Sequence, residues 1–135
     1  MKIAKPTKWL IVSILVVSAV VFLFFFRMYR DDIKAITDFM ASYEQFDKAV
    51  FFYTGKGRLD GLGKANEALI ELQARASLRL SSLIKNDGAL MHRAREVADL
   101  SRRELEDFGM EGRRLLHEKR IAAYARFQEL CGPRR

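Results

Sequence analysis

The hydrophobic and polar positions divide the chain into one long apolar run and a body with helical periodicity. Residues 9–26 are apolar except for Ser13 and Ser18, and none of them is charged. Eighteen residues of helix extend about 27 Å, which approaches the roughly 30 Å hydrocarbon thickness of a bilayer. This run predicts a transmembrane helix over residues 9–29, preceded by a short N-terminal tail, residues 1–8.

The residues at and near the ends of the apolar run are of the types that hold a helix in a bilayer. Tryptophan and tyrosine rings favour the headgroup level, and an arginine there reaches the headgroups with its long side chain. The candidate anchor residues, which would contact membrane lipid, are Trp9, Phe22, Phe26, Arg27 and Tyr29.

A cleaved signal peptide is the alternative to a retained span. Its best cleavage site would follow Val17-Ser18-Ala19, but seven more apolar residues come directly after that tripeptide. A cleavage region lacks such an apolar extension, so we expect the run to remain as an uncleaved signal anchor.

The basic residues on the two sides of the span predict its orientation. Three lysines precede it within residues 1–8, and Arg27, Arg30 and Lys34 follow it. The two counts are equal, but so short and basic an N-terminus favours the cytoplasmic side. We therefore expect a single-pass protein of the inner membrane, with its N-terminus in the cytoplasm and its C-terminal region in the periplasm.

Residues 30–131 have the periodicity of helices, so the predicted fold class is all-α: one transmembrane helix followed by an antiparallel helical bundle. Apolar residues recur at steps of three and four, which makes the wide stripe of core-facing helices. The expected helices cover residues 31–54, 60–85 and 88–130, and residues 132–135 form a C-terminal tail.

The ends of these helices also carry sequence signals. The first helix is expected to continue from the span and to stop at Gly55, since glycine is common just after a helix end. Asn86-Asp87-Gly88 is expected to connect the second and third helices as antiparallel neighbours, with Asp87 capping the third.

The last segment has two interpretations. As one helix, residues 88–130 would extend about 64 Å, well beyond its partners. The sequence "GMEG" at 109–112 contains two glycines, which cost a helix roughly 2 kcal/mol, and packing can outweigh this. We favour a continuous helix, giving three in the body; a turn at 109–112 would give four.

Charge and cysteine content narrow the class of protein. The net charge is +7 and the pI about 9.8, as in many nucleic-acid-binding proteins. However, residues 1–30 contain five basic residues and no acidic one, so the excess flanks the span and argues against a nucleic-acid partner. Cys131 is the one cysteine, and in an oxidising compartment it is a candidate for an intermolecular disulfide; the alternative is an unpaired thiol at a helix end.

The patterns for cofactor, phosphate and metal sites are incomplete. The glycine-rich segment 55–63 lacks the spacing of phosphate-binding loops and is expected to link two helices. Helical bundles hold di-iron centres through Glu-x-x-His pairs, but neither His92 nor His117 has a glutamate three residues before it. The expected cofactor and metal content is therefore none.

One arrangement of polar residues resembles a catalytic site. A turn at 86–87 would bring Ser81 or Ser82 across from His92, with Glu96 one turn further. Nucleophilic catalysis also needs oxyanion donors and a pocket that excludes water, and a narrow hairpin indicates neither. The expected catalytic residues are none, and the protein is expected not to be an enzyme.

Aromatic and arginine clusters are the candidate interface. Phe51, Phe52 and Tyr53 are consecutive, so they point about 100° apart on a helix and cannot all enter one core. At least one is expected to meet a second subunit, the loop at 55–63 or a ligand. Two arginine pairs on one face of the last segment are either self-paired with acidic neighbours or a docking patch: Arg102, Arg103, Arg113 and Arg114.

The sequence supports two classes of function. The first is a membrane-anchored, non-enzymatic interaction or scaffold component of the bacterial envelope, with a protein partner or self-association; its layout resembles that of several divisome, secretion and phage-lysis components. The second is a stand-alone extracytoplasmic ligand-binding or sensory module, similar to the input bundles of chemoreceptors. An enzyme is the third class and has the least support.

Overall fold

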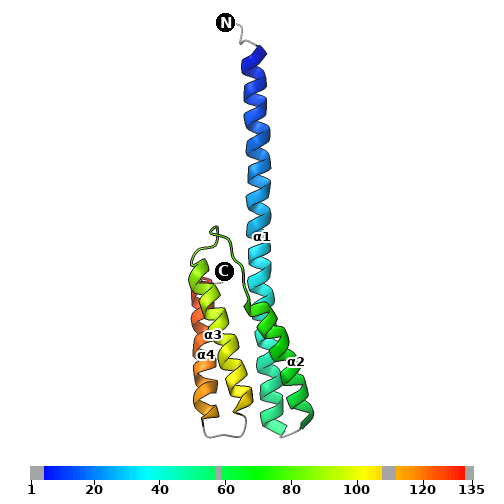
Figure 1. Ribbon diagram of the computed structural model, residues 1–135, viewed down its shortest axis with the longest axis vertical. Coiled ribbons are helices and arrows are strands. Elements are labelled where there is room, and N and C mark those ends of the chain that lie inside the picture. The colour runs from blue at the N-terminus through cyan, green and yellow to red at the C-terminus, as the bar shows by residue number, and fades with distance from the viewer. Residues whose placement is uncertain (1–4, 57–58, 108–111, 133–135) are drawn as a thin grey trace.

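The computed structural model describes residues 5–56, 59–107 and 112–132, and side chains within 7–51, 63–107 and 112–132 (Figure 1). All the secondary structure in these residues is helical, which confirms the predicted all-α fold class. The four helices are α1 (Lys5–Lys56), α2 (Leu59–Ala76), α3 (Asp87–Glu106) and α4 (Arg113–Leu130).

The first helix, α1, runs without a break from the apolar segment into the bundle, as expected. It has 52 residues and therefore extends about 78 Å. No glycine or proline occurs between Thr7 and Thr54, so nothing in the sequence interrupts its hydrogen bonds. The expected stop at Gly55 is wrong by a residue or two, since α1 includes Lys56.

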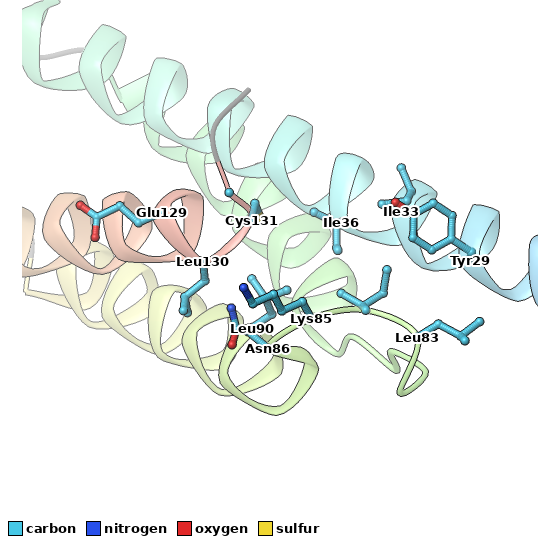
Figure 2. Close-up of a pocket in the computed structure, with 12 residues that line it drawn as sticks. Tyr29, Ile33, Ile36, Leu83, Lys85, Asn86, Leu90, Glu129, Leu130 and Cys131 are labelled. Atoms are coloured by element: carbon cyan, nitrogen blue, oxygen red, sulfur yellow. The ribbon is translucent and has the colours of Figure 1, made fainter. Parts of the chain in front are cut away.

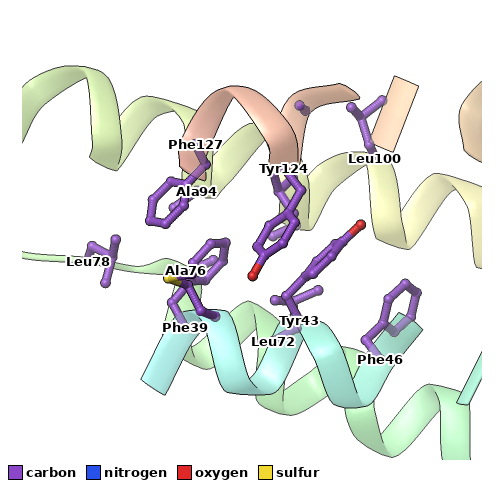
Figure 3. Packing of buried hydrophobic residues seen from close by; sticks show 14 of the residues in the cluster. Phe39, Tyr43, Phe46, Leu72, Ala76, Leu78, Ala94, Leu100, Tyr124 and Phe127 are labelled. Atoms are coloured by element: carbon purple, nitrogen blue, oxygen red, sulfur yellow. The ribbon is translucent and has the colours of Figure 1, made fainter. Parts of the chain in front are cut away.

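The bundle consists of two helical hairpins, α1 with α2 and α3 with α4, while the first half of α1 extends away from it (Figure 1). Aromatic side chains fill the space between α1 and α4 (Figure 3). The rings of Tyr43 and Tyr124 stack with centroids 3.7 Å apart, and Phe39 meets Phe127 edge-on at 4.8 Å. These contacts join the two hairpins through one core.

The favoured continuous helix over 88–130 is wrong, because the segment folds into the separate, antiparallel helices α3 and α4. Folding back places the apolar stripes of both halves in one core, where Val97 and Phe127 are fully buried. A continuous helix would leave the second apolar stripe in water. The free energy cost of exposing that stripe exceeds the roughly 2 kcal/mol by which two glycines disfavour a helix. The residues 108–111 lie outside the described ranges.

The second helix is also shorter than expected, since α2 ends at Ala76 and residues 77–86 form an irregular loop. Leu78 and Ile84 of this loop enter the core. The buried carboxylate of Asp32 in α1 accepts hydrogen bonds from Ser81, one from its backbone N–H at 3.1 Å and one from its hydroxyl. These contacts outweigh the helical periodicity of residues 77–85.

The loop alters the connection between α2 and α3 but not their relation. The two helices pack against each other in opposite directions, as predicted, although ten residues rather than a tight turn join them. Asn86, not Asp87, occupies the cap position of α3, and its φ of 63° is the left-handed conformation that asparagine tolerates.

Candidate functional site

A buried arginine is the centre of the main polar cluster in the described residues. The side chain of Arg120, in α4, has no exposed surface. Its Nε donates to the carboxylate of Glu104 in α3. Its Nη1 donates to the Tyr43 hydroxyl at 2.9 Å and to Asp47 Oδ1 at 3.0 Å, both in α1. One guanidinium therefore connects three helices.

Glu104 and Arg120 occupy buried positions of their helices, whereas Asp47 lies at the edge of the core with 48% of its side chain exposed. Asp47 follows Tyr43 by four residues, and Glu104 follows fully buried Ser101 by three. Arg120 precedes fully buried Phe127 by seven. The helical period thus carries Glu104 and Arg120 into the core together with their apolar neighbours, and Asp47 to its edge.

Burial and ion pairing shift the pKa of Arg120 in opposite directions. Burial alone would lower the pKa of Arg120, but the hydrogen bond and charge of Glu104 raise it above its usual value, so the guanidinium stays charged. The Arg120 Cζ also lies 5.5 Å from the Tyr43 ring centre and 5.3 Å from that of Phe46, within cation–π range. Burial raises the pKa of Tyr43 to about 12, so its hydroxyl stays protonated.

His117 closes the outer side of the cluster. Its Nδ1 lies 2.6 Å from Glu104 Oε1 and 3.0 Å from Arg120 Nη2. One nitrogen cannot donate to the carboxylate and accept from the guanidinium at once. The shorter distance, to the charged oxygen, favours the tautomer in which Nδ1 carries the proton and donates to Glu104.

The arrangement is suited to fixing helices rather than to a reaction. The Nε and Nη1 of Arg120 donate to acceptors within the cluster, and the side chain has no exposed surface through which an anionic ligand could reach it. Within the part of the chain that the structure describes, no group of three or more His, Cys, Asp or Glu side chains is placed to hold a metal ion.

The serine, histidine and carboxylate near residues 81–96 do not assemble. The Ser81 hydroxyl donates to Asp32. His92 is exposed on α3, and Glu96 pairs with Arg93 at 2.7 Å. The reason is the loop at 77–86, which directs Ser81 toward α1 rather than across a hairpin from His92.

Sequence reasoning missed the arginine cluster, although a signal for it exists. Asp47 interrupts the apolar row of the first helix, and Glu104 and Arg120 interrupt the rows of the later helices. Buried charges are usually paired, so charges of opposite sign on the apolar faces of different helices indicate a buried ion pair.

The candidate anchor residues are all exposed along the first half of α1. Trp9, Phe22, Phe26 and Tyr29 have between 48% and 71% of their surface exposed, and Arg27 is exposed as well. The bundle covers none of the apolar segment, which leaves these side chains to contact another medium.

The candidate interface residues are only partly described. Phe51 has 77% of its surface exposed, whereas the side chains of Phe52 and Tyr53 lie outside the described residues. Arg102 pairs with Asp99 and Glu106, and Arg103 pairs with Asp99.

The remaining candidates lie on α4. Arg114 pairs with Glu118 at 3.7 Å, and Arg113 is half-buried at the start of the helix. Cys131 is exposed at the other end of α4, so its thiol is accessible from solvent. An intermolecular role for these residues remains a prediction.

Comparisons with protein-family models, curated proteins and solved structures give no match to this chain.

Arg120→Met is expected to lower the free energy of unfolding by about 3–5 kcal/mol, because it leaves Glu104 buried without its cation. Adding Glu104→Met should recover most of this loss, since the uncompensated charge is removed. Chemical denaturation of the full chain in detergent measures both. Arg114→Met, also in α4 but with 91% of its side chain exposed, should change stability little. Equal losses in the single and double variants would contradict the buried pair.

The raised pKa of Tyr43 makes stability depend on pH in the alkaline range. Below its usual pKa of 10.0 the phenol is protonated in both states; between 10 and 12 it ionises only in the unfolded chain. Stability should therefore fall as pH rises, by at most about 1.4 kcal/mol per pH unit. Tyr43→Phe should lack this component, so the stability difference from wild type should change only above pH 10. A difference between Tyr43→Phe and wild type that does not change with pH would refute the assignment.

Proposed function

We propose that this chain is a non-enzymatic, single-pass protein of the bacterial inner membrane that acts as an interaction or scaffold component of the envelope. Its N-terminus lies in the cytoplasm and its bundle in the periplasm. The observation that carries this proposal is the apolar segment of α1, which is exposed along its length and continuous with the bundle.

The exposure of this segment favours a membrane span over the core helix of a soluble domain. Its best window has a mean hydropathy of 2.9, and none of that window is buried in the bundle. The core helix of a soluble domain would be covered by its neighbours, since exposed apolar surface costs about 25 cal/mol per Å² in water. A bilayer covers such a surface at no cost to the bundle.

The continuity of α1 also argues against cleavage. A cut after Ala19 would leave the apolar residues 20–26 at the new N-terminus, exposed beyond the bundle. A patch of that kind on a secreted protein promotes aggregation. Retention of the whole segment in lipid avoids this exposure.

The same continuity fixes the bundle relative to the membrane surface. Asp32, the first buried residue of α1, comes three residues after Tyr29, so no flexible linker separates span and bundle. Phe51 lies 22 residues beyond Tyr29, which corresponds to about 33 Å of helix. We infer that the bundle presents a partner-binding edge around Phe51 at a fixed height, to another envelope protein or to a second copy.

Arginines placed in the middle of the span test the anchor. Wild-type chain should stay with membranes through an alkaline carbonate wash, whereas Val16→Arg with Val20→Arg should be released. Each arginine costs about 2.5–3.5 kcal/mol at the centre of a spanning helix. The matched control is Ile70→Arg with Ile121→Arg, at exposed positions of the bundle, and it should remain with the membranes.

Release of wild-type chain by the wash, or a mature N-terminus after Ala19, would contradict the proposal.

The orientation of the chain is tested by labelling the thiol of Cys131 with a membrane-impermeant maleimide in spheroplasts. Labelling before lysis supports a periplasmic bundle, and labelling only after lysis contradicts it.

A photo-crosslinking residue at position 51 tests the interaction role in intact cells. It should form a discrete adduct with an envelope protein or with a second copy, because Phe51 extends from the bundle. The control position is Gln45, exposed on the same helix but about 120° around its axis. Equal background adducts at both positions would mean that the edge around Phe51 is not an interface.

A further inference from the structure

A groove lies at the end of the bundle where α1 leaves it (Figure 2). Its volume is about 420 Å³, within the usual range of ligand sites. Three parts of the chain line it: α1 from Tyr29 to Ile36, the loop from Leu83 to Asn86, and the adjoining ends of α3 and α4. The groove is separate from the Arg120 cluster, and none of its lining residues belongs to that cluster.

The groove lies at the level where the proposed span ends. Tyr29 is the last residue of that span and also lines the groove. Asp32, about 4.5 Å further along the helix axis, holds Ser81 through its backbone N–H and hydroxyl. These bonds fasten the loop to α1 beside the membrane surface, so the groove opens at the boundary between lipid and water.

An apolar stripe on α1 leads from the span into the groove. Its members are spaced three or four residues apart and therefore share one face of the helix: Phe22, Phe26, Tyr29, Ile33 and Ile36. Ile33 and Tyr29 are 42% and 48% exposed, and Leu83 on the facing loop is 41% exposed. An acyl chain lying against the span can follow this stripe without leaving apolar surface.

The charged lining of the groove is limited to one residue of each sign among its described residues, Lys85 and Glu129. Lys85 belongs to the loop beside Asn86, which supplies a further hydrogen-bond donor (Figure 2). An exposed lysine in the lining of an apolar groove, beside the end of the proposed span, suits a phosphate.

We propose that this groove binds one phospholipid of the bilayer that α1 crosses. An acyl chain lies along Tyr29, Ile33 and Leu83, and Lys85 binds the phosphate. The inference rests on the proposed membrane anchoring. A membrane lipid is favoured over a peptide or a second copy because the apolar surface of the groove is continuous with the lipid-facing surface of the span.

Native mass spectrometry of the full chain tests this site, in mild detergent with phosphatidylethanolamine and phosphatidylglycerol added. Wild type should retain one phospholipid, and Ile33→Glu with Lys85→Glu should lose it. The matched control makes the same two changes at exposed positions of α2, Ile70→Glu with Lys64→Glu, and should keep the lipid. Circular dichroism with unchanged helix content shows that both variants fold.

Retention of no lipid by wild type, or equal retention by both variants, would overturn the proposal. So would a chain dimer that only the groove variant loses, because the occupant would then be a second copy. Flotation with vesicles of the same lipids distinguishes failure of the groove proposal from failure of the membrane anchor. A chain that floats but shows no groove-dependent lipid refutes the groove proposal alone. A chain that does not float refutes the proposed function.

A second measurement does not depend on disrupting the groove. In a Trp9→Phe background, Leu83→Trp carries the one tryptophan of the chain. Its fluorescence should be quenched in vesicles whose phospholipids have brominated acyl chains. Leu115→Trp, equally apolar and exposed at the opposite end of α4, should not be quenched. Equal fluorescence of Leu83→Trp in brominated and ordinary vesicles would refute contact of the loop with acyl chains.

Discussion

The charge of Arg120 is the constraint on which the arrangement of the bundle depends. A guanidinium without solvent contact must have its donors matched by the protein, because an unpaired buried charge costs several kcal/mol. Its partners come from α1 and α3, so α4 has few positions in which all of them meet. The aromatic contacts between α1 and α4 are compatible with sliding along the helix axes, whereas hydrogen bonds of defined direction are not. Polar pairing thus selects one register from those that the apolar core permits.

The parts of the fold that were predictable are those with a local signal. The apolar segment and the apolar face of the first helix follow from spacing alone, since the buried residues Ile36, Met40, Tyr43 and Val50 are three, four or seven residues apart. The retained span itself remains a prediction, since its evidence is length, composition and exposure. Residues 77–86 were misassigned because their leucines continue a helical period, whereas the deciding contact, between Asp32 and Ser81, joins residues 49 apart.

The Arg120 cluster was even less predictable, because its contacts join residues that are far apart in the sequence. Arg120 and Asp47 are 73 residues apart, and no spacing rule connects them. Only the misplacement of each charge on an apolar face was visible, and each alone is compatible with an end of a stripe or a solvent-facing position. Glu104 and Arg120 can meet only where α4 runs antiparallel to α3, and a continuous helix over residues 88–130 excludes that arrangement. A wrong helix boundary therefore concealed the cluster.

The unbroken course of α1 has a geometric consequence for any assembly of this protein. A helix without a hinge transmits rotation as well as position, so the side of the bundle that carries Phe51 has a fixed direction around the helix axis relative to the residues of the proposed span. Two chains whose spans meet along a given face would have their bundles set at a corresponding angle. Adding a single residue between the proposed span and the bundle would turn the bundle by about 100°, while adding a whole number of turns would restore its direction. The phase of one helix thereby determines which neighbours the bundle can face.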